Sequence, residues 1–214
     1  MSPRRPTLCL VTDRRSARSP LPSLVAAAVR GGVDWVQVRE KDLDGAALLA
    51  LVREIAASAR AVNPAVRVIV NRRIDVALAA GASGAQLGFD ALPPREARAL
   101  LGARALIGAS AHDHAEVLAA ARAGADYALL APIFAPFSKP QSREPLGLGV
   151  LREACERASI PVLAQGGIDA QRAGACIAAG SAGVAVTGEI CSAADPERAA
   201  RALRAALDAA TRLS

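Results

Sequence analysis

A repeated pattern of helix end, glycine and apolar stretch is the feature that most constrains the fold of this chain. Each copy reads as an Ala-rich helix end, a glycine, two or three connecting residues and a short apolar run, and the copies cover residues 26–38, 77–88, 118–132 and 176–188. Glycine is common where a helix ends in the left-handed conformation, and a short apolar run is typical of a buried strand. The sequence therefore predicts a helix–strand unit that occurs four times.

Four further apolar stretches lie between these copies, separated by helix-like segments, at residues 7–12, 66–71, 103–110 and 160–167. Eight strands, each followed by a helical segment, suit a small (β/α)8 barrel at a length of 214 residues. Apolarity that is continuous rather than alternating indicates parallel strands that are covered on both faces. We therefore predict an α/β fold in which residues 1–214 form a single-domain (β/α)8 TIM barrel.

A doubly wound parallel sheet would produce the same local pattern, and two observations favour the barrel over it. The first strand is not followed by a G-x-G-x-x-G motif. Polar residues follow nearly every predicted strand, whereas in a doubly wound sheet only the strands beside the switch point should carry them.

The composition excludes several classes of partner. The net charge is +6, but aromatic residues make up only 2% of the chain and the basic residues are scattered, so we expect no nucleic acid. A phosphorylated small molecule suits that distribution better. The apolar runs are too short for a signal peptide or a membrane span, so we expect no membrane partner. The four cysteines lack metal-ligand spacing, which predicts buried free thiols and a cytoplasmic location.

The candidate site residues are polar residues and glycines that follow the predicted strands. In a barrel they converge on one mouth, because the loops that follow the strands all lie at its C-terminal end. These candidates are Gln37, Arg39, Lys41, Asn71, Arg72, His112, Gly166, Gly167, Thr187 and Gly188.

The stretch VQVREKD, residues 36–42, runs from an apolar strand into four consecutive charges. A guanidinium binds anions through a bidentate fork and an ammonium acts as a mobile point charge, so Arg39 and Lys41 together predict an anion clamp. We expect Glu40 and Asp42 to be solvated. Trp35, just before the stretch, is expected to pack on the outside of the barrel.

Glycines close the last two strands, at Gly166–Gly167 and at Gly188 after Thr187. In barrels this pair of loops often binds phosphate through backbone N–H groups and the start of a short helix. His112 follows the fifth strand and could act as a general acid or base, whereas His114 is expected to begin the next helix.

The longest loop, which follows the sixth strand, carries Ser138 and Lys139 and is rich in proline. A loop of this length in a compact domain typically covers a site. We therefore expect this loop to exclude water from the mouth while Lys139 contacts an anion.

Eight motifs, in this order and spacing, resemble the thiamine phosphate synthase and TenI-type thiazole tautomerase family. They are LVTD, GGVDWVQVREKD, VNRRIDVALAAGASGAQLG, AGADYALLAPIF, SKP, PLGL, IPVLAQGGI and AAGSAGVAV. The resemblance covers nearly the whole chain, and the combination is specific although each motif alone is weak. It implies an enzyme of thiamine biosynthesis that joins an aminopyrimidine methyl diphosphate to a thiazole phosphate and releases diphosphate.

The resemblance also implies roles for individual residues. Gln37 would contact the pyrimidine, and Ser138 would lie near the thiazole phosphate. That phosphate would be bound by Gly167 and by amides around Thr187 and Gly188, with Gly166 beside them. The residues that would hold the diphosphate are Arg39, Lys41, Asn71 and Lys139.

The chain departs from the synthase pattern at the positions implied to bind Mg²⁺. The synthase pattern has an aspartate directly after the asparagine that corresponds to Asn71, and this chain has Arg72 there. The pattern also has an acidic pair after the fourth strand, where this chain has Asp90 at the first position and Ala91 at the second. Because magnesium prefers carboxylate oxygens, a Mg²⁺ cofactor is doubtful, with Asp90 as its one candidate ligand.

These departures leave three functions open. Arg72 could replace the metal electrostatically in a synthase. We favour this interpretation because a proton transfer on a substrate with a single phosphate would not need the anion clamp. In a TenI-type thiazole tautomerase, His112 would instead shuttle a proton without a metal. A non-catalytic barrel that binds a thiazole or thiamine phosphate is the third. A homodimer is compatible with the resemblance.

Overall fold

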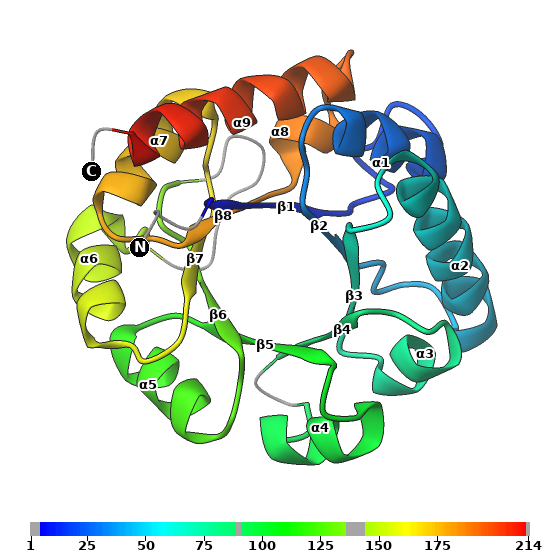
Figure 1. The fold of residues 1–214 in the computed structure, drawn as a ribbon, viewed down its shortest axis with the longest axis horizontal. Coiled ribbons are helices and arrows are strands. Elements are labelled where there is room, and N and C mark those ends of the chain that lie inside the picture. The colour runs from blue at the N-terminus through cyan, green and yellow to red at the C-terminus, as the bar shows by residue number, and fades with distance from the viewer. Residues whose placement is uncertain (1–4, 89–90, 136–143, 213–214) are drawn as a thin grey trace.

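A computed structural model describes residues 5–88, 91–135 and 144–212. Its eight parallel strands close into a barrel, each pairing with the next in chain order and the last with the first. Figure 1 shows this ring of strands from one end, with the helices outside it. The strands are β1 (Thr7–Val11), β2 (Trp35–Val38), β3 (Arg67–Asn71), β4 (Gly84–Leu87), β5 (Leu106–Ala111), β6 (Tyr127–Leu130), β7 (Val162–Gln165) and β8 (Gly183–Val186). The predicted (β/α)8 barrel is confirmed.

The helices alternate with the strands, and β8 is followed by a short and a long helix. They are α1 (Leu21–Arg30), α2 (Gly45–Val62), α3 (Ile74–Ala79), α4 (Pro94–Leu101), α5 (His114–Arg122), α6 (Gly147–Arg157), α7 (Ala170–Ala178), α8 (Gly188–Cys191) and α9 (Pro196–Thr211). Aspartate side chains cap the first turns of α2, α5, α7 and α9 by accepting a backbone N–H. None of the helices in the described ranges is long and apolar enough to cross a bilayer.

The repeated helix–strand unit of the sequence is a repeated backbone conformation. Its glycines Gly32, Gly81, Gly124 and Gly180 have φ values of +106°, +59°, +91° and +93°, which L side chains rarely adopt. In the first and third copies, the aspartate before the strand accepts a backbone N–H of the neighbouring strand, from Leu8 to Asp34 at 2.8 Å and from Ile107 to Asp126 at 2.7 Å. The glycine thus turns the chain and the aspartate fixes where the strand begins.

The interior of the barrel is filled by side chains from alternate strands. Trp35 of β2 meets Tyr127 of β6 edge-on, with ring centroids 4.9 Å apart. The corresponding residues of the other two copies are Gly84 of β4 and Gly183 of β8, where a Cβ atom would fall 1.8 Å and 2.1 Å from a backbone oxygen. The expectation that Trp35 packs outside the barrel is wrong, because its side chain belongs to the interior cluster around Tyr127.

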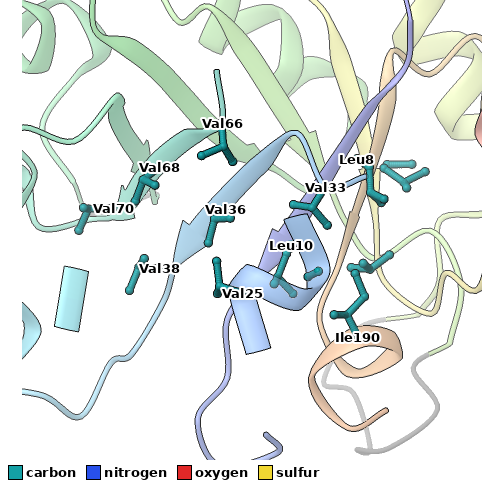
Figure 2. Close-up of a cluster of buried hydrophobic side chains, with 14 of the residues drawn as sticks. Leu8, Leu10, Val25, Val33, Val36, Val38, Val66, Val68, Val70 and Ile190 are labelled. Atoms are coloured by element: carbon teal, nitrogen blue, oxygen red, sulfur yellow. The ribbon is translucent and has the colours of Figure 1, made fainter. Parts of the chain in front are cut away.

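A second apolar layer lies between the strands and the helices. Leu8, Leu10, Val36, Val38, Val68 and Val70 point outward from β1, β2 and β3 and belong to one cluster with Val25 of α1 and Ile190 of α8 (Figure 2). Because the strands bury both faces, their sequences lack the alternation of a half-exposed sheet.

Candidate active site

A cavity of about 300 Å³ opens at the C-terminal ends of the strands. Its lining comes from every strand or from the loop that follows it. Seven of the predicted site residues line it, namely Gln37, Arg39, Lys41, Asn71, Arg72, His112 and Thr187. The barrel therefore brings together residues that lie 150 positions apart between Gln37 and Thr187.

Among the described residues, three cationic side chains line this cavity. Arg39 and Lys41 follow β2 and Arg72 follows β3, and Lys41 and Arg72 also line a smaller adjoining cavity of about 250 Å³. Arg72 has φ +65°, the only positive φ of a non-glycine residue in the described ranges. Its backbone N–H donates to the carbonyl of Gln86 at 2.8 Å, and its carbonyl accepts from Ile74 at 3.1 Å. A strained backbone at the mouth of a cavity is a common feature of functional sites.

Two glutamines on the strands of the barrel, Gln37 of β2 and Gln86 of β4, are buried. Gln37 is 3% exposed, and its Nε2 donates to Oδ1 of Asn71 at 3.1 Å. Gln86 is 1% exposed, and its Nε2 donates to Oγ of Ser110 at 3.1 Å. Among the described residues, the Oε1 atoms of both glutamines have no hydrogen-bond donor. Gln86 is not among the described lining residues of the cavity, but its hydrogen bond holds Ser110, which lines it.

His112 lies at the end of β5 and lines the cavity, whereas His114 begins α5 as expected. The backbone N–H of His112 donates to Oε2 of Glu116 at 2.6 Å, and Nδ1 of His112 lies 3.5 Å from the same oxygen. Glu116 in turn donates its backbone N–H to the N-cap Asp113 at 2.8 Å. The start of α5 thus fixes the backbone of His112 and places a carboxylate beside its imidazole.

The glycine pair after β7 lies against the loop that follows β6. The carbonyls of Gln165 and Gly166 accept the backbone N–H groups of Ile133 at 2.8 Å and Phe134 at 3.1 Å. A Cβ atom on Gly167 would lie 2.2 Å from the carbonyl oxygen of Ala135, so the close approach of two loops requires glycine here.

The two glycine loops leave backbone donors available. In the part of the chain that the structure describes, the N–H groups of Gly167 and Thr187 have no hydrogen-bond acceptor. Thr187 lines the cavity, whereas Gly166, Gly167 and Gly188 are not among its described lining residues. Three predicted site residues, Asp90, Ser138 and Lys139, lie outside the described residues.

The expectation that Glu40 is solvated is wrong. Glu40 is 6% exposed, and its carboxylate accepts the hydroxyl of Thr12 at 2.6 Å and the backbone N–H of Arg14 at 3.1 Å. Asp42 is exposed as expected but is paired with Arg14 and Arg15. Desolvation raises the pKa of Asp42, but the hydrogen bond from Arg15 and the charge of Arg14 outweigh it and lower that pKa. The sequence could not reveal which carboxylate turns inward.

The chemistry of the described lining does not fit a magnesium ion, which is bound mainly through carboxylate oxygens. The cavity is lined by cations, amides, hydroxyls and an imidazole, and no described carboxylate lines it. Glu40 lines the adjoining cavity, but both of its oxygens already accept hydrogen bonds. No group of three or more His, Cys, Asp or Glu side chains within the described ranges could hold a metal.

Comparison with known proteins gives consistent matches. The sequence model described as thiamine monophosphate synthase matches residues 8–190. The chain is 41% identical over 207 residues to the putative thiamine-phosphate synthase of Geobacter sulfurreducens, with 96% of each chain covered. It is 41% identical over 212 residues to the thiamine-phosphate synthase of Chlorobium luteolum, with 97% of this chain and 95% of the relative covered.

A solved structure agrees with these sequence matches. The thiamine phosphate pyrophosphorylase of Pyrococcus furiosus superposes with a TM-score of 0.85 at 30% sequence identity. The superposition covers 96% of this chain and 97% of that one.

Proposed function

The chain belongs to the thiamine monophosphate synthase family, a family of thiamine biosynthesis, and we propose that it joins an aminopyrimidine methyl diphosphate to a thiazole phosphate. Diphosphate is the second product. The observation that carries the proposal is the convergence of Arg39, Lys41 and Arg72 on one cavity, beside the buried amide of Gln37 and the half-buried amide of Asn71. Such a lining suits a multiply charged leaving group attached to a polar heterocycle.

The diphosphate group would be held by the three cations. Arg39 presents a planar fork of donors to two phosphate oxygens, and Lys41 supplies a point charge that can follow the group as it leaves. The amide of Asn71 and, from the loop after β6, Lys139 complete this proposed set. Preorganised positive charge is effective here because negative charge on the diphosphate increases as it departs.

The aminopyrimidine ring would be recognised by Gln37. The Oε1 atom of Gln37 is buried and lacks a donor among the described residues, while Nε2 is held by Asn71 at 3.1 Å. An exocyclic amino group is a suitable donor for that oxygen, and pairing it would remove the cost of an unsatisfied buried acceptor. The hydrogen bond to Asn71 fixes which end of the amide faces the ring.

The thiazole phosphate would be bound at the glycine loops after β7 and β8. The available N–H groups of Gly167 and Thr187 and the adjacent Gly166 and Gly188 offer backbone donors to a phosphate. Ser138 would approach the same phosphate from the loop after β6. The two phosphorylated substrates would thus occupy opposite sides of one mouth.

The resemblance to the synthase family implies the bond changes of the proposed reaction. The bond between the methylene carbon and the diphosphate oxygen breaks, and its electron pair leaves with diphosphate. The pyrimidine-stabilised cation that results is captured by the ring nitrogen of the thiazole, which forms the new carbon–nitrogen bond. Arg39, Lys41 and Lys139 stabilise the departing charge, and His112 at the mouth is placed to exchange a proton with the bound rings.

Arg72 is the residue of the proposed mechanism that departs from the synthase pattern. Its guanidinium lies at the cavity where the family pattern has an aspartate, so it would neutralise the diphosphate directly. Because the described donors do not form a magnesium site, no step is assigned to a metal. Asp90 alone remains a predicted ligand.

Product formation tests the proposal. The purified chain is mixed with both phosphorylated substrates, and thiamine phosphate and diphosphate are quantified with magnesium and with a chelator present. We expect the two products in equal amounts, with little dependence on added magnesium. Absence of product under both conditions would refute the synthase.

The tautomerase alternative depends on His112, which lies in the cavity with Glu116 beside it. If this chain were a tautomerase, it would convert a non-aromatic thiazole carboxylate phosphate, and His112→Ala would abolish that conversion. A carrier would bind the phosphates without turning over either substrate. The synthase predicts instead that the pyrimidine diphosphate is consumed.

We further propose a homodimer that works in the cytoplasm. Leu78 of α3 and Leu100 of α4 are 59% and 55% exposed on neighbouring helices and could supply an apolar contact. The four cysteines are free thiols, as suits a reducing compartment. Light scattering of the purified chain measures the dimer directly, and a monomer at micromolar concentration would exclude it.

A further inference from the structure

The segment Arg39–Lys41 alternates between exposed and buried side chains. Arg39 and Lys41 are exposed and line the cavity, while Glu40 between them is 6% exposed. Burial of a carboxylate is unfavourable unless it is paired and hydrogen-bonded. The burial of Glu40 between the two residues of the anion clamp therefore requires a structural explanation.

The partners of Glu40 come from the loop that follows β1. Oγ1 of Thr12 donates to Oε1 of Glu40 at 2.6 Å, and the backbone N–H of Arg14 donates to Oε2 at 3.1 Å. The guanidinium of Arg14 adds an ion pair, with Nε 3.8 Å from Oε2. Both oxygens are thus engaged within the protein.

Thr12 connects this carboxylate to the backbone of the clamp. It is fully buried, and its hydroxyl accepts the backbone N–H of Arg39 at 3.0 Å while donating to Glu40. Its own backbone N–H donates to the carbonyl of Gln37 at 2.9 Å. Thr12 is therefore hydrogen-bonded to three groups of the segment 37–40. They are the carbonyl of Gln37, the backbone N–H of Arg39 and the carboxylate of Glu40.

We propose that Thr12 and Glu40 are positioning residues that hold Arg39 and Lys41 in the geometry needed for diphosphate. The inference rests on the proposed function and deepens it, because neither residue lines the cavity in which the three cations meet. The negative charge of Glu40 also offsets part of the repulsion among Arg14, Arg39 and Lys41, which would otherwise spread these side chains apart in the absence of the ligand.

The test compares two variants and their combination. Thr12→Val keeps the shape of the side chain and removes the hydroxyl, and Glu40→Gln keeps the shape and removes the charge. Isothermal titration with inorganic diphosphate should show each variant binding about 10- to 100-fold more weakly, as when a group that orients a ligand-binding residue is lost. Affinity for thiazole phosphate should fall less than affinity for diphosphate, because the hydrogen bonds of Thr12 and Glu40 go to β2 and to the loops after β1 and β2, although β8 lies next to β1.

Two further variants separate positioning from a general loss of structure. Thr12→Ser retains a hydroxyl and should bind diphosphate nearly as well as the unmodified chain. Asp42→Asn removes a negative charge from the same loop without touching Thr12, and should change affinity less than about threefold. In the double variant Thr12→Val/Glu40→Gln the losses should be less than additive, since both residues act through one network.

The inference is overturned if Thr12→Val binds diphosphate normally, or if both ligands are weakened equally. Hydrogen exchange of the peptide covering residues 36–43 supplies a readout that does not depend on function. Thr12→Val and Glu40→Gln should accelerate exchange there, and Asp42→Asn should not. If the unmodified chain fails to bind diphosphate, the proposed function fails, and unchanged exchange in both variants would separately refute the positioning role.

Discussion

At the scale of single residues, a substitution of Arg72 tests the proposed function. Arg72→Asn removes the cation but keeps a residue type that tolerates the left-handed backbone at φ +65°. We expect kcat/KM for the pyrimidine diphosphate to fall about 10- to 100-fold, because one preorganised group facing the leaving group is lost. Steady-state kinetics measures this fall.

A matched control for Arg72 lies on the outer surface. Arg53 of α2 donates to the carbonyl of Ala79, away from the cavity, and Arg53→Gln should leave the kinetics unchanged. Equal losses in the two variants would mean that net charge, rather than Arg72 itself, matters.

Cys9 gives the chain a predictable dependence of stability on alkaline pH. Burial in the barrel interior raises the pKa of its thiol from 9.0 to about 12. Below pH 9.0 the Cys9 thiol is protonated in both the folded and the unfolded state. Between pH 9.0 and about 12 only the unfolded state loses this proton, so the free energy of unfolding falls as pH rises.

Urea denaturation at about pH 8 and about pH 10.5 tests this dependence. In Cys9→Ala the free energy of unfolding should fall less steeply than in the unmodified chain, by up to about 1.4 kcal/mol per pH unit. Identical slopes would show that Cys9 does not carry the effect.

At the scale of elements, α9 is attached to the base of the barrel by Arg204. Its side chain is 7% exposed, and Nη1 donates to the carbonyl of Pro6 at 2.8 Å and to Oδ2 of Asp34 at 3.0 Å. Asp34 in turn accepts the N–H of Leu8 in β1. One guanidinium thus joins α9 to the starts of β1 and β2.

Arg204→Met should lower the free energy of unfolding by about 1–3 kcal/mol, because buried acceptors lose their donor. Thermal unfolding measures the change. Arg201→Met on the same helix is the control, since Arg201 is 69% exposed and its pair with Glu197 should contribute at most about 0.5 kcal/mol. Comparable losses in both variants would argue against the buried attachment.

Gly84 of β4 tests the packing of the barrel interior. A Cβ atom there would lie 1.8 Å from the carbonyl oxygen of Leu106, a backbone atom that cannot move aside without breaking the register of β5. Gly84→Ala should therefore destabilise the fold by about 1–3 kcal/mol or more. Gly149→Ala in α6, where nothing lies within 4 Å, should be neutral or stabilising in the same denaturation experiment.

At the scale of the whole molecule, the single tryptophan reports on the closure of the barrel. Trp35 packs against Tyr127 across the interior, so its surroundings persist only while β2 and β6 belong to one closed ring. Urea unfolding curves from Trp35 fluorescence and from far-UV circular dichroism should therefore share one midpoint. A fluorescence change at lower urea would reveal local opening instead.

The fold could be predicted from the sequence because its signals are local. A left-handed glycine such as Gly32 or Gly124 and the apolar run after it act within one helix–strand unit, and four such units with four further strands between them leave few architectures. Barrel closure then placed Gln37, Arg39 and Thr187 at one cavity, because loops after parallel strands share one end.

Only the tertiary structure decided that Trp35 packs in the barrel interior and that Glu40 is buried. Which face of a strand looks inward, and which of several consecutive charges is buried, depends on partners from other units, here Tyr127 for Trp35 and Thr12 for Glu40. A buried charge is tolerated only where donors converge on it, and that convergence exists only after the barrel has closed. The sequence by itself determined the barrel and seven of the residues that line its mouth, while contacts between distant units determined how those residues are held.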